Sequence, residues 1–186
     1  MSVTVRVATA QDAVAIAAIY APMVKHGVAS FEVVPPSVEE IAQRIDATLP
    51  RFPYLVAERD GQLLGYAYAG QHRAREAYQW SVDVSVYIAP QAHRGGIGRA
   101  LYERLLAILE AQHFHAAYAS IVIPNAASVG LHEALGFRHV GTSPEVGFKH
   151  GQWRDVGYWR RPLSNETPPR ALVPFAQWRE GLACTT

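Results

Sequence analysis

The chain has 186 residues, of which 49% are hydrophobic and 18% are charged, and this composition predicts one compact domain with a substantial core. The formal net charge of +1 argues against a partner bound through a strong field, such as nucleic acid or a membrane surface. We expect neither a signal peptide nor a membrane span, because no stretch approaches the roughly 20 apolar residues that a span requires.

Cysteine and histidine usage narrows the chemistry further. Cys184 is the only cysteine, so no disulfide can form within the chain, which is typical of a cytoplasmic protein. The eight histidines show no metal-ligand spacing such as His-Glu-x-x-His. We therefore predict a cytoplasmic protein without a metal site.

Capping and turn signals divide the first half of the chain into strands and helices. Thr9–Asp12 and Ser37–Glu40 resemble capping boxes, which mark helix starts. Asp60-Gly61 is a hairpin signal between two alternating segments. The predicted elements are a strand at 4–8, helices at 13–24 and 37–48, and strands at 54–58 and 63–69.

Strands and helices alternate in the second half, which the period of the apolar residues indicates. The predicted elements are a strand at 82–88, a helix with Leu101, Leu105 and Leu109 on one face, a strand at 116–121, a helix that Asn125 caps and Gly136 ends, and two aromatic-rich strands ending near Trp159. This order predicts a mixed α/β fold with one central sheet. The turn-rich remainder is expected to lie over the surface as a tail or to be disordered.

A glycine-rich stretch, "HRGGIGR" at residues 93–99, lies between an apolar strand and a helix start. Glycine lets a backbone approach a ligand closely, and the free N–H groups of a helix start attract anions. Arg94 and Arg99 add donors for phosphate oxygens. The spacing fits neither the dinucleotide fingerprint nor the Walker loop, so the residues alone leave a phosphate site and an ordinary flexible loop both open.

Two motifs carry a resemblance to a known superfamily. "HRGGIGRALYERLL" resembles the pyrophosphate-binding turn of the GNAT acetyltransferases, with Gly96 and Gly98 in the two glycine positions and His93 where Gln or Arg is usual. "PNAASVGLHEALGF" resembles a later motif of that superfamily. Further segments, among them "ASFEVVPP", "AYQWSVDVSVYI" and "VGFKHGQWRDVGYW", are similar in order to the phosphinothricin N-acetyltransferase family, over residues 3–161.

The resemblance implies both a fold and an activity. The fold is α/β (α+β): a mixed, mostly antiparallel central sheet, splayed in the middle, with helices on both faces. The implied activity is transfer of an acetyl group from acetyl-CoA to the α-amine of a small amino-acid-like substrate such as L-phosphinothricin. Because no histidine is paired with Cys184, we expect direct transfer in a ternary complex. We expect a homodimer, with the GNAT domain at 1–163 and the tail at 164–186.

Three alternatives stay open. Within the class, the substrate would be methionine sulfoximine or sulfone. From other classes, the chain would be a non-catalytic acyl-CoA-binding sensor or a plain dimeric scaffold. Retention of both Asp83 and His132 argues against a sensor, which needs only the glycine turn.

Cofactor contacts are implied residue by residue. Splayed strands leave backbone N–H and C=O groups that must find partners, and Val84, Val86 and Ile88 are expected to offer theirs to the pantetheine arm. Asn125 is either a helix cap only or also a cofactor contact. The implied acetyl-CoA-binding residues are Val86, Tyr87, Ile88, Arg94, Gly95, Gly96, Ile97, Gly98, Arg99, Asn125 and Ser128.

Two residues are candidates for catalysis. Asp83 stands in mid-strand, where Asp is rare, and is either part of a structural ion pair or the general base that deprotonates the amine. The family has Glu in this position, one methylene longer. His132 is either an ordinary helix-surface histidine or a group that protonates the leaving thiolate or binds substrate.

The substrate-binding candidates are Phe31, Arg73, Arg75 and Tyr78. Phe31 matches an aromatic residue of the substrate pocket in the family. The segment 73–78 is either a solvated loop or a substrate contact, since Arg binds a carboxylate with two parallel hydrogen bonds.

Overall fold

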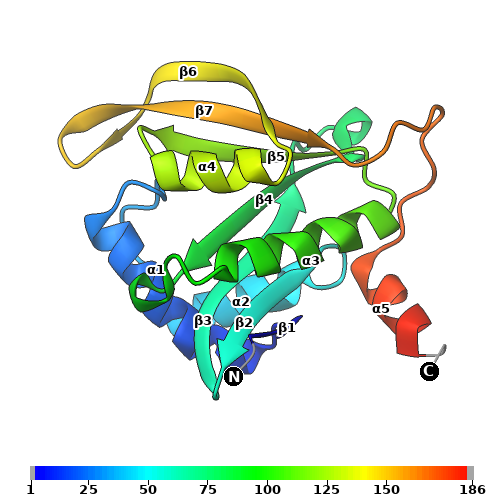
Figure 1. The fold of residues 1–186 in the computed structure, drawn as a ribbon, viewed down its shortest axis with the longest axis horizontal. Coiled ribbons are helices and arrows are strands. Elements are labelled where there is room, and N and C mark those ends of the chain that lie inside the picture. Colours follow the sequence, from blue (N-terminus) through cyan, green and yellow to red (C-terminus); the bar gives the residue numbers. More distant parts are fainter. Residues whose placement is uncertain (1–2, 184–186) are drawn as a thin grey trace.

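A single seven-stranded sheet forms the centre of the molecule (Figure 1). The structure, a computed structural model, describes residues 3–183. The strand order is β1-β2-β3-β4-β5-β7-β6, and every neighbouring pair is antiparallel except β4 and β5. The strands are β1 (Thr4–Val7), β2 (Tyr54–Arg59), β3 (Gln62–Gln71), β4 (Ser81–Ile88), β5 (Ala116–Ile123), β6 (Arg138–Lys149) and β7 (Gln152–Pro162).

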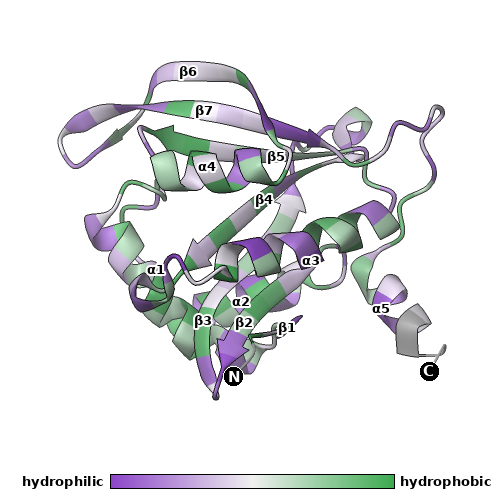
Figure 2. Cartoon of the chain, in the orientation of Figure 1, coloured by the Kyte–Doolittle hydropathy of each residue, from purple (hydrophilic) through white to green (hydrophobic). Residues whose placement is uncertain are grey.

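Helices cover both faces of the sheet. Successive strand residues point to opposite sides, so one strand can pack apolar side chains against helices on both faces. Tyr54 and Val56 of β2 pack with the first two helices, whereas Leu55 and Ala57 pack with the third. Figure 2 shows hydrophobic residues along the central strands and hydrophilic ones on the outer side of α3. The helices are α1 (Ala13–His26), α2 (Val38–Thr48), α3 (Ile97–Ala111), α4 (Ala126–Ala134) and α5 (Phe175–Ala183), with short 3-10 turns at Ala10–Asp12, Glu76–Tyr78 and Pro90–Ala92.

The sheet splits between its two parallel strands. β4 and β5 pair only through Ser81 with Ala116, Val82 with Ala117 and Asp83 with Tyr118. Beyond that point β4 stays paired with β3, and β5 stays paired with β7, while the two strands diverge (Figure 1). The predicted mostly antiparallel sheet, splayed in the middle between helices on both faces, is confirmed.

Short sequence patterns predicted two helix starts and one hairpin turn correctly. Ser37 Oγ accepts from the Glu40 N–H at 3.2 Å, and the Glu40 carboxylate accepts from the Ser37 N–H at 2.6 Å, which is the predicted capping box. Asn125 Oδ1 accepts from the Ser128 N–H at 3.1 Å and caps α4. Asp60 and Gly61 both have positive φ, +53° and +77°, as a tight hairpin turn requires.

The segment after residue 163 contains a helix, α5, that the sequence analysis does not predict. Phe175 at its start is fully buried in the core below α3. Gln112 connects the segment before α5 to the rest of the domain. Its Nε2 donates to the carbonyl of Val173 in that segment at 2.7 Å and to the carbonyl of Arg51 at 3.0 Å. The domain boundary at residue 163 stays a prediction, and Cys184 lies outside the described residues. None of the helices within residues 3–183 is long and apolar enough to cross a membrane.

Candidate active site

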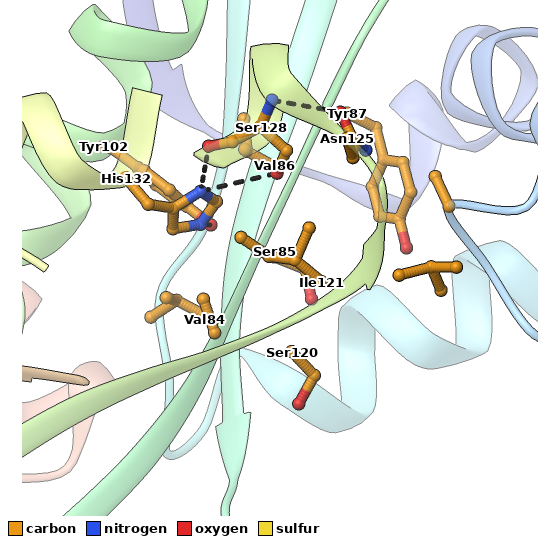
Figure 3. Close-up of a pocket in the computed structure, with 13 residues that line it drawn as sticks. Val84, Ser85, Val86, Tyr87, Tyr102, Ser120, Ile121, Asn125, Ser128 and His132 are labelled. Atoms are coloured by element: carbon orange, nitrogen blue, oxygen red, sulfur yellow. Dashed lines mark hydrogen bonds between the residues drawn. The ribbon is translucent and has the colours of Figure 1, made fainter. Parts of the chain in front are cut away.

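A pocket occupies the gap where β4 and β5 diverge (Figure 3). It brings together six of the predicted site residues, namely Val84, Val86, Tyr87, Asn125, Ser128 and His132. Its other lining residues are Ala29, Ser85, Tyr102, Ala119, Ser120, Ile121 and Val122. The pocket therefore draws on β4, β5, α3, α4 and the segment after α1.

β4 presents different side chains to the two faces of the sheet. Val84 belongs to the core under α3, and Val86 packs against it. Tyr87 faces the opposite side and packs edge-on against Tyr20 of α1, with ring centroids 5.0 Å apart. A gap between strands is open to both faces, so two reactants that approach from opposite sides of the sheet can meet in it.

A second hollow, the Phe31 pocket, adjoins the first. The two share Ala29, Tyr87, Ser120 and Val122, and the second adds Ser30, Phe31, Val146, Val156 and Tyr158. Phe31 is 40% exposed, and its ring leaves no room for a Cβ at Gly147 of β6. The structure thus places the predicted Phe31 beside the gap, next to the predicted reaction site.

The glycine turn has the backbone of an anion site. Gly96 has φ +74° and begins α3 without any side-chain cap, so the first N–H groups of the helix are available to an anion. Arg94 also has a left-handed conformation, φ +62°. Gly98 lies against α4, since a Cβ there would be 3.0 Å from Leu131 Cδ2. The two glycines are therefore needed for different reasons, conformation at Gly96 and close packing at Gly98.

The side chains around the turn differ in their exposure and in their partners. Arg94 and Arg99 are exposed, and Arg99 reaches Glu103 at 3.3 Å. Ile97 is buried, so only its backbone can contact a ligand. His93 Nε2 donates to the Ile88 carbonyl at 3.2 Å, which ties the turn to the end of β4. The glycine turn offers uncapped N–H groups, and the end of β4 beside it has backbone groups that β5 does not pair.

Asp83 lies at the apex of the gap, in the last pair that joins β4 to β5. Its Oδ1 is 2.7 Å from Nδ1 of His72, and its side chain is 45% exposed. Burial raises the pKa of Asp83, while the hydrogen bond from His72 and the charge of Arg73 lower it. His72 was missed by the sequence analysis. The antiparallel register pairs Gly70 with Asp83, and residue 72 lies on the same face of the sheet as residue 70. Only with this register known would the sequence have placed His72 beside Asp83.

His132 is buried, with 3% exposure, so the helix-surface interpretation is wrong. Its Nδ1 is 2.7 Å from the Ser128 carbonyl oxygen, which can only accept, so Nδ1 carries the hydrogen. Nε2 then accepts from the Tyr102 hydroxyl at 3.0 Å. Burial lowers the pKa of His132, which favours the neutral imidazole. Tyr102, fully buried, is a second lining residue that the sequence analysis missed.

The segment 73–78 does not line either pocket. Arg73 and Arg75 are exposed, and Tyr78 is 44% exposed. Arg73 acts on Asp83 only through its charge. In this chain the segment has the exposure of a solvated loop, and its role in substrate binding stays a prediction. Within residues 3–183, no three His, Cys, Asp or Glu side chains gather as a metal site.

The acetyltransferase (GNAT) domain family model matches residues 5–157. The chain belongs to the GNAT acetyltransferase family. It is 41% identical to the phosphinothricin N-acetyltransferase of Streptomyces viridochromogenes over 94% of this chain and 96% of that one. It is 35% identical to the L-methionine sulfoximine/L-methionine sulfone acetyltransferase of Salmonella typhimurium, over 90% of this chain and 99% of that one.

A solved structure agrees with the fold of this GNAT acetyltransferase. The GNAT superfamily phosphinothricin acetyltransferase from Sinorhizobium meliloti, in complex with AcCoA, superposes with a TM-score of 0.88 at 38% identity. The alignment covers 96% of this chain and 100% of that one. The cosubstrate of the family is acetyl-CoA.

A buried lysine fixes one wall of the Phe31 pocket in this acetyltransferase. Lys149, at the end of β6, is 4% exposed, and its Nζ donates to the carbonyls of Ser30 and Glu32 at 2.6 and 2.8 Å. Those carbonyls flank Phe31. His150 Nε2 also donates to the Gly27 carbonyl, at 3.1 Å. The β6–β7 turn thereby fixes the segment that carries Phe31.

We expect Lys149→Met to loosen this wall, because it leaves two backbone carbonyls without their donor. The free energy of unfolding should fall by about 1–3 kcal/mol, the usual cost of an unsatisfied buried polar group. KM for the amine acceptor should rise, while Kd for acetyl-CoA stays unchanged. Thermal unfolding, steady-state kinetics and calorimetry measure the three quantities. An unchanged acceptor KM in a destabilised variant would show that Lys149 serves stability alone.

Proposed function

We propose that the chain transfers the acetyl group of acetyl-CoA directly to the α-amine of a small amino-acid-like acceptor such as L-phosphinothricin. The observation that carries this proposal is the gap between β4 and β5. The uncapped glycine turn follows the open end of β4, and a carboxylate, Asp83, stands at the apex. A ligand that extends from the turn into the gap would bring its far end toward that carboxylate.

Acetyl-CoA supplies an activated acetyl thioester when bound. Backbone N–H groups of residues 96–99 would hold its pyrophosphate, with Arg94 and Arg99 adding positive charge. Val84, Val86 and Ile88 would offer strand-edge backbone groups to the pantetheine arm, since β5 does not pair with them, and Tyr87 lines the same gap. Asn125 and Ser128 border the same pocket from α4, so the capping role of Asn125 and a cofactor contact are compatible.

Asp83 is proposed as the general base. An ammonium group has no lone pair to attack a thioester, so a proton must first leave the nitrogen. A carboxylate within reach, directly or through one water, can accept it. Because burial raises the pKa of Asp83, its basicity lies closer to the working pH than that of an ordinary Asp. The base acts only when deprotonated, so kcat/KM should fall as the pH drops through this pKa.

His132 is proposed to serve the leaving thiolate or to contact the acceptor. Both ring nitrogens are engaged, with Ser128 and Tyr102. For either role one of these two hydrogen bonds must open, because the neutral ring has a single N–H. His132 and Tyr102 both line the pocket in the gap. A small shift of either side chain would therefore make a ring nitrogen of His132 available to a reactant.

The acceptor class rests on the relatives. The S. viridochromogenes protein is named for phosphinothricin, and the Salmonella protein for L-methionine sulfoximine and L-methionine sulfone. Both kinds of acceptor join an α-amino acid to a compact polar head. Phe31 would bound the apolar stem, while Arg73, Arg75 and Tyr78 would bind the anionic groups. The methionine sulfoximine activity is therefore the second candidate function.

The test compares L-phosphinothricin, L-methionine sulfoximine and spermidine at equal concentration, with the released CoA thiol as the signal. We expect both amino acids to be acetylated and spermidine to be a poor acceptor, because the arginines repel a polyamine. Arg73→Ala and Arg75→Ala should each lower kcat/KM for the amino acid by about ten- to a hundredfold, the worth of one charge-assisted hydrogen bond. Kd for acetyl-CoA should not change. If spermidine is the best acceptor, the proposed substrate class is wrong.

We also propose a cytoplasmic homodimer, with its catalytic domain at residues 1–163. Phe148 and Trp153 are 59% and 60% exposed and pack edge-on at 5.3 Å on the β6–β7 hairpin, at the edge of the sheet. Val33 and Val34 are exposed as well. Apolar groups of this size on an edge hairpin favour a second copy as partner, which sedimentation analysis would detect.

A further inference from the structure

His72 is held rigidly beside the carboxylate of Asp83. Its ring stacks on Tyr118 of β5 with centroids 4.4 Å apart and planes 18° apart. Tyr78 meets it edge-on at 6.1 Å. The His72 side chain is only 18% exposed, and Nδ1 is 2.7 Å from Asp83 Oδ1. A histidine fixed in this way presents one nitrogen to one carboxylate oxygen.

The hydrogen bond has one reasonable direction when the imidazole is neutral. An ionised carboxylate only accepts, so Nδ1 carries the hydrogen and donates it to Oδ1. Within the described part of the chain, Asp83 Oδ2 has no hydrogen-bond partner. One oxygen is thus anchored, and the other is left to accept a proton from elsewhere.

We propose that His72 is a positioning residue for the reaction: it anchors Asp83 by Oδ1 and so aims Oδ2 at the amine of the acceptor. The inference rests on the proposed role of Asp83 as general base. In the proton transfer, the ammonium N–H bond breaks and an Oδ2–H bond forms. His72 keeps its own proton throughout. Asp has a shorter reach than Glu, so its rotamer matters more.

The other groups near Asp83 are few. Arg73 lies in the same loop as His72 and acts on Asp83 through its charge. Burial raises the pKa of the Tyr68 phenol on β3, and the negative charge of Asp83 raises it further, so Tyr68 stays neutral. From β5 comes Tyr118, which pairs with Asp83 through the backbone. Among these groups, only His72 donates a hydrogen bond to the carboxylate.

Two substitutions separate the hydrogen bond from the ring stack. His72→Phe keeps an aromatic ring on Tyr118 but removes the donor. His72→Asn restores an N–H donor near the position of Nδ1 without the ring. His139→Phe is the matched control, because His139 is an exposed histidine on β6, away from the gap.

We expect His72→Phe to lower kcat with L-phosphinothricin, or with L-methionine sulfoximine if that is the better acceptor, by about ten- to a hundredfold. KM for the acceptor and Kd for acetyl-CoA should change little. Loss of the donor should also raise the pKa of Asp83, because the hydrogen bond lowers it, and should move the acid limb of the kcat/KM profile to higher pH. His72→Asn should restore most of kcat and move the acid limb of the profile back toward its wild-type pH. His139→Phe should match wild type in both measurements.

The results distinguish this inference from the proposed function. If His72→Phe has the rate and the acid limb of wild type while Asp83→Asn is inactive, His72 does not position the base and only this inference fails. If His72→Asn is as impaired as His72→Phe, the ring stack matters and the hydrogen bond does not, which also overturns it. If Asp83→Asn keeps its activity within about twofold, the base assignment itself is wrong, and the role of His72 falls with it.

Discussion

Asp83→Asn is expected to lower kcat by about 10²–10⁴-fold, the usual contribution of a positioned general base. Asn keeps the size of Asp and an oxygen that can accept from His72 Nδ1, so the contact at 2.7 Å can persist. What the amide lacks is the ability to take a proton at neutral pH. Steady-state kinetics with saturating acetyl-CoA measures the loss.

Asp83→Glu is the matched variant, because it keeps the carboxylate and only lengthens its reach. It should retain much of the activity, because the family that this sequence resembles has Glu in this position. Calorimetry with acetyl-CoA should give the wild-type Kd for both variants, since the role of Asp83 is toward the amine. An Asp83→Asn enzyme with near wild-type kcat would mean that water or another group accepts the proton.

Gly96→Val is expected to raise Kd for acetyl-CoA about tenfold or more, the loss of at least one charge-assisted hydrogen bond. A Cβ at this position meets no protein atom within 4 Å, so the space beside Gly96 is open to a ligand. The side chain would enter that space, where the pyrophosphate is proposed to contact the uncapped N–H groups of α3. Calorimetry measures Kd, and circular dichroism checks the fold.

Backbone strain needs a control, because Gly96 has φ +74° and a side chain disfavours that conformation by roughly 1–2 kcal/mol. Gly151 on the β6–β7 turn provides it, since its φ is +72° and a Cβ there would also meet no protein atom within 4 Å. Gly151→Val should carry a similar strain and leave Kd for acetyl-CoA unchanged. Equal Kd values for wild type and a folded Gly96→Val variant would make the turn an ordinary loop.

Features set by neighbouring residues were predictable from the sequence. The capping boxes, the Asp60-Gly61 turn and the period-2 alternation of β4 depend on residues within a few positions of one another, and the structure contains all of them. The splay was predictable only from the resemblance, because nothing in β4 or β5 by itself marks where their pairing ends.

Contacts between distant segments were not predictable in this way. Lys149 binds carbonyls 117 and 119 positions earlier, and no local pattern links the two segments. His72 lies closer to Asp83, but their contact depends on the register of β3 against β4. Helix α5 was missed because turn-rich residues precede it, and its stability comes from burial of Phe175 in a core built by other elements.

The most direct test of direct acetyl transfer in the β4–β5 gap is an initial-velocity study in which acetyl-CoA and L-phosphinothricin are varied together. A ternary complex, with the two reactants meeting from opposite faces of the sheet, predicts double-reciprocal lines that intersect. Parallel lines would indicate an acetyl-enzyme formed before the acceptor binds, and that result would contradict the account.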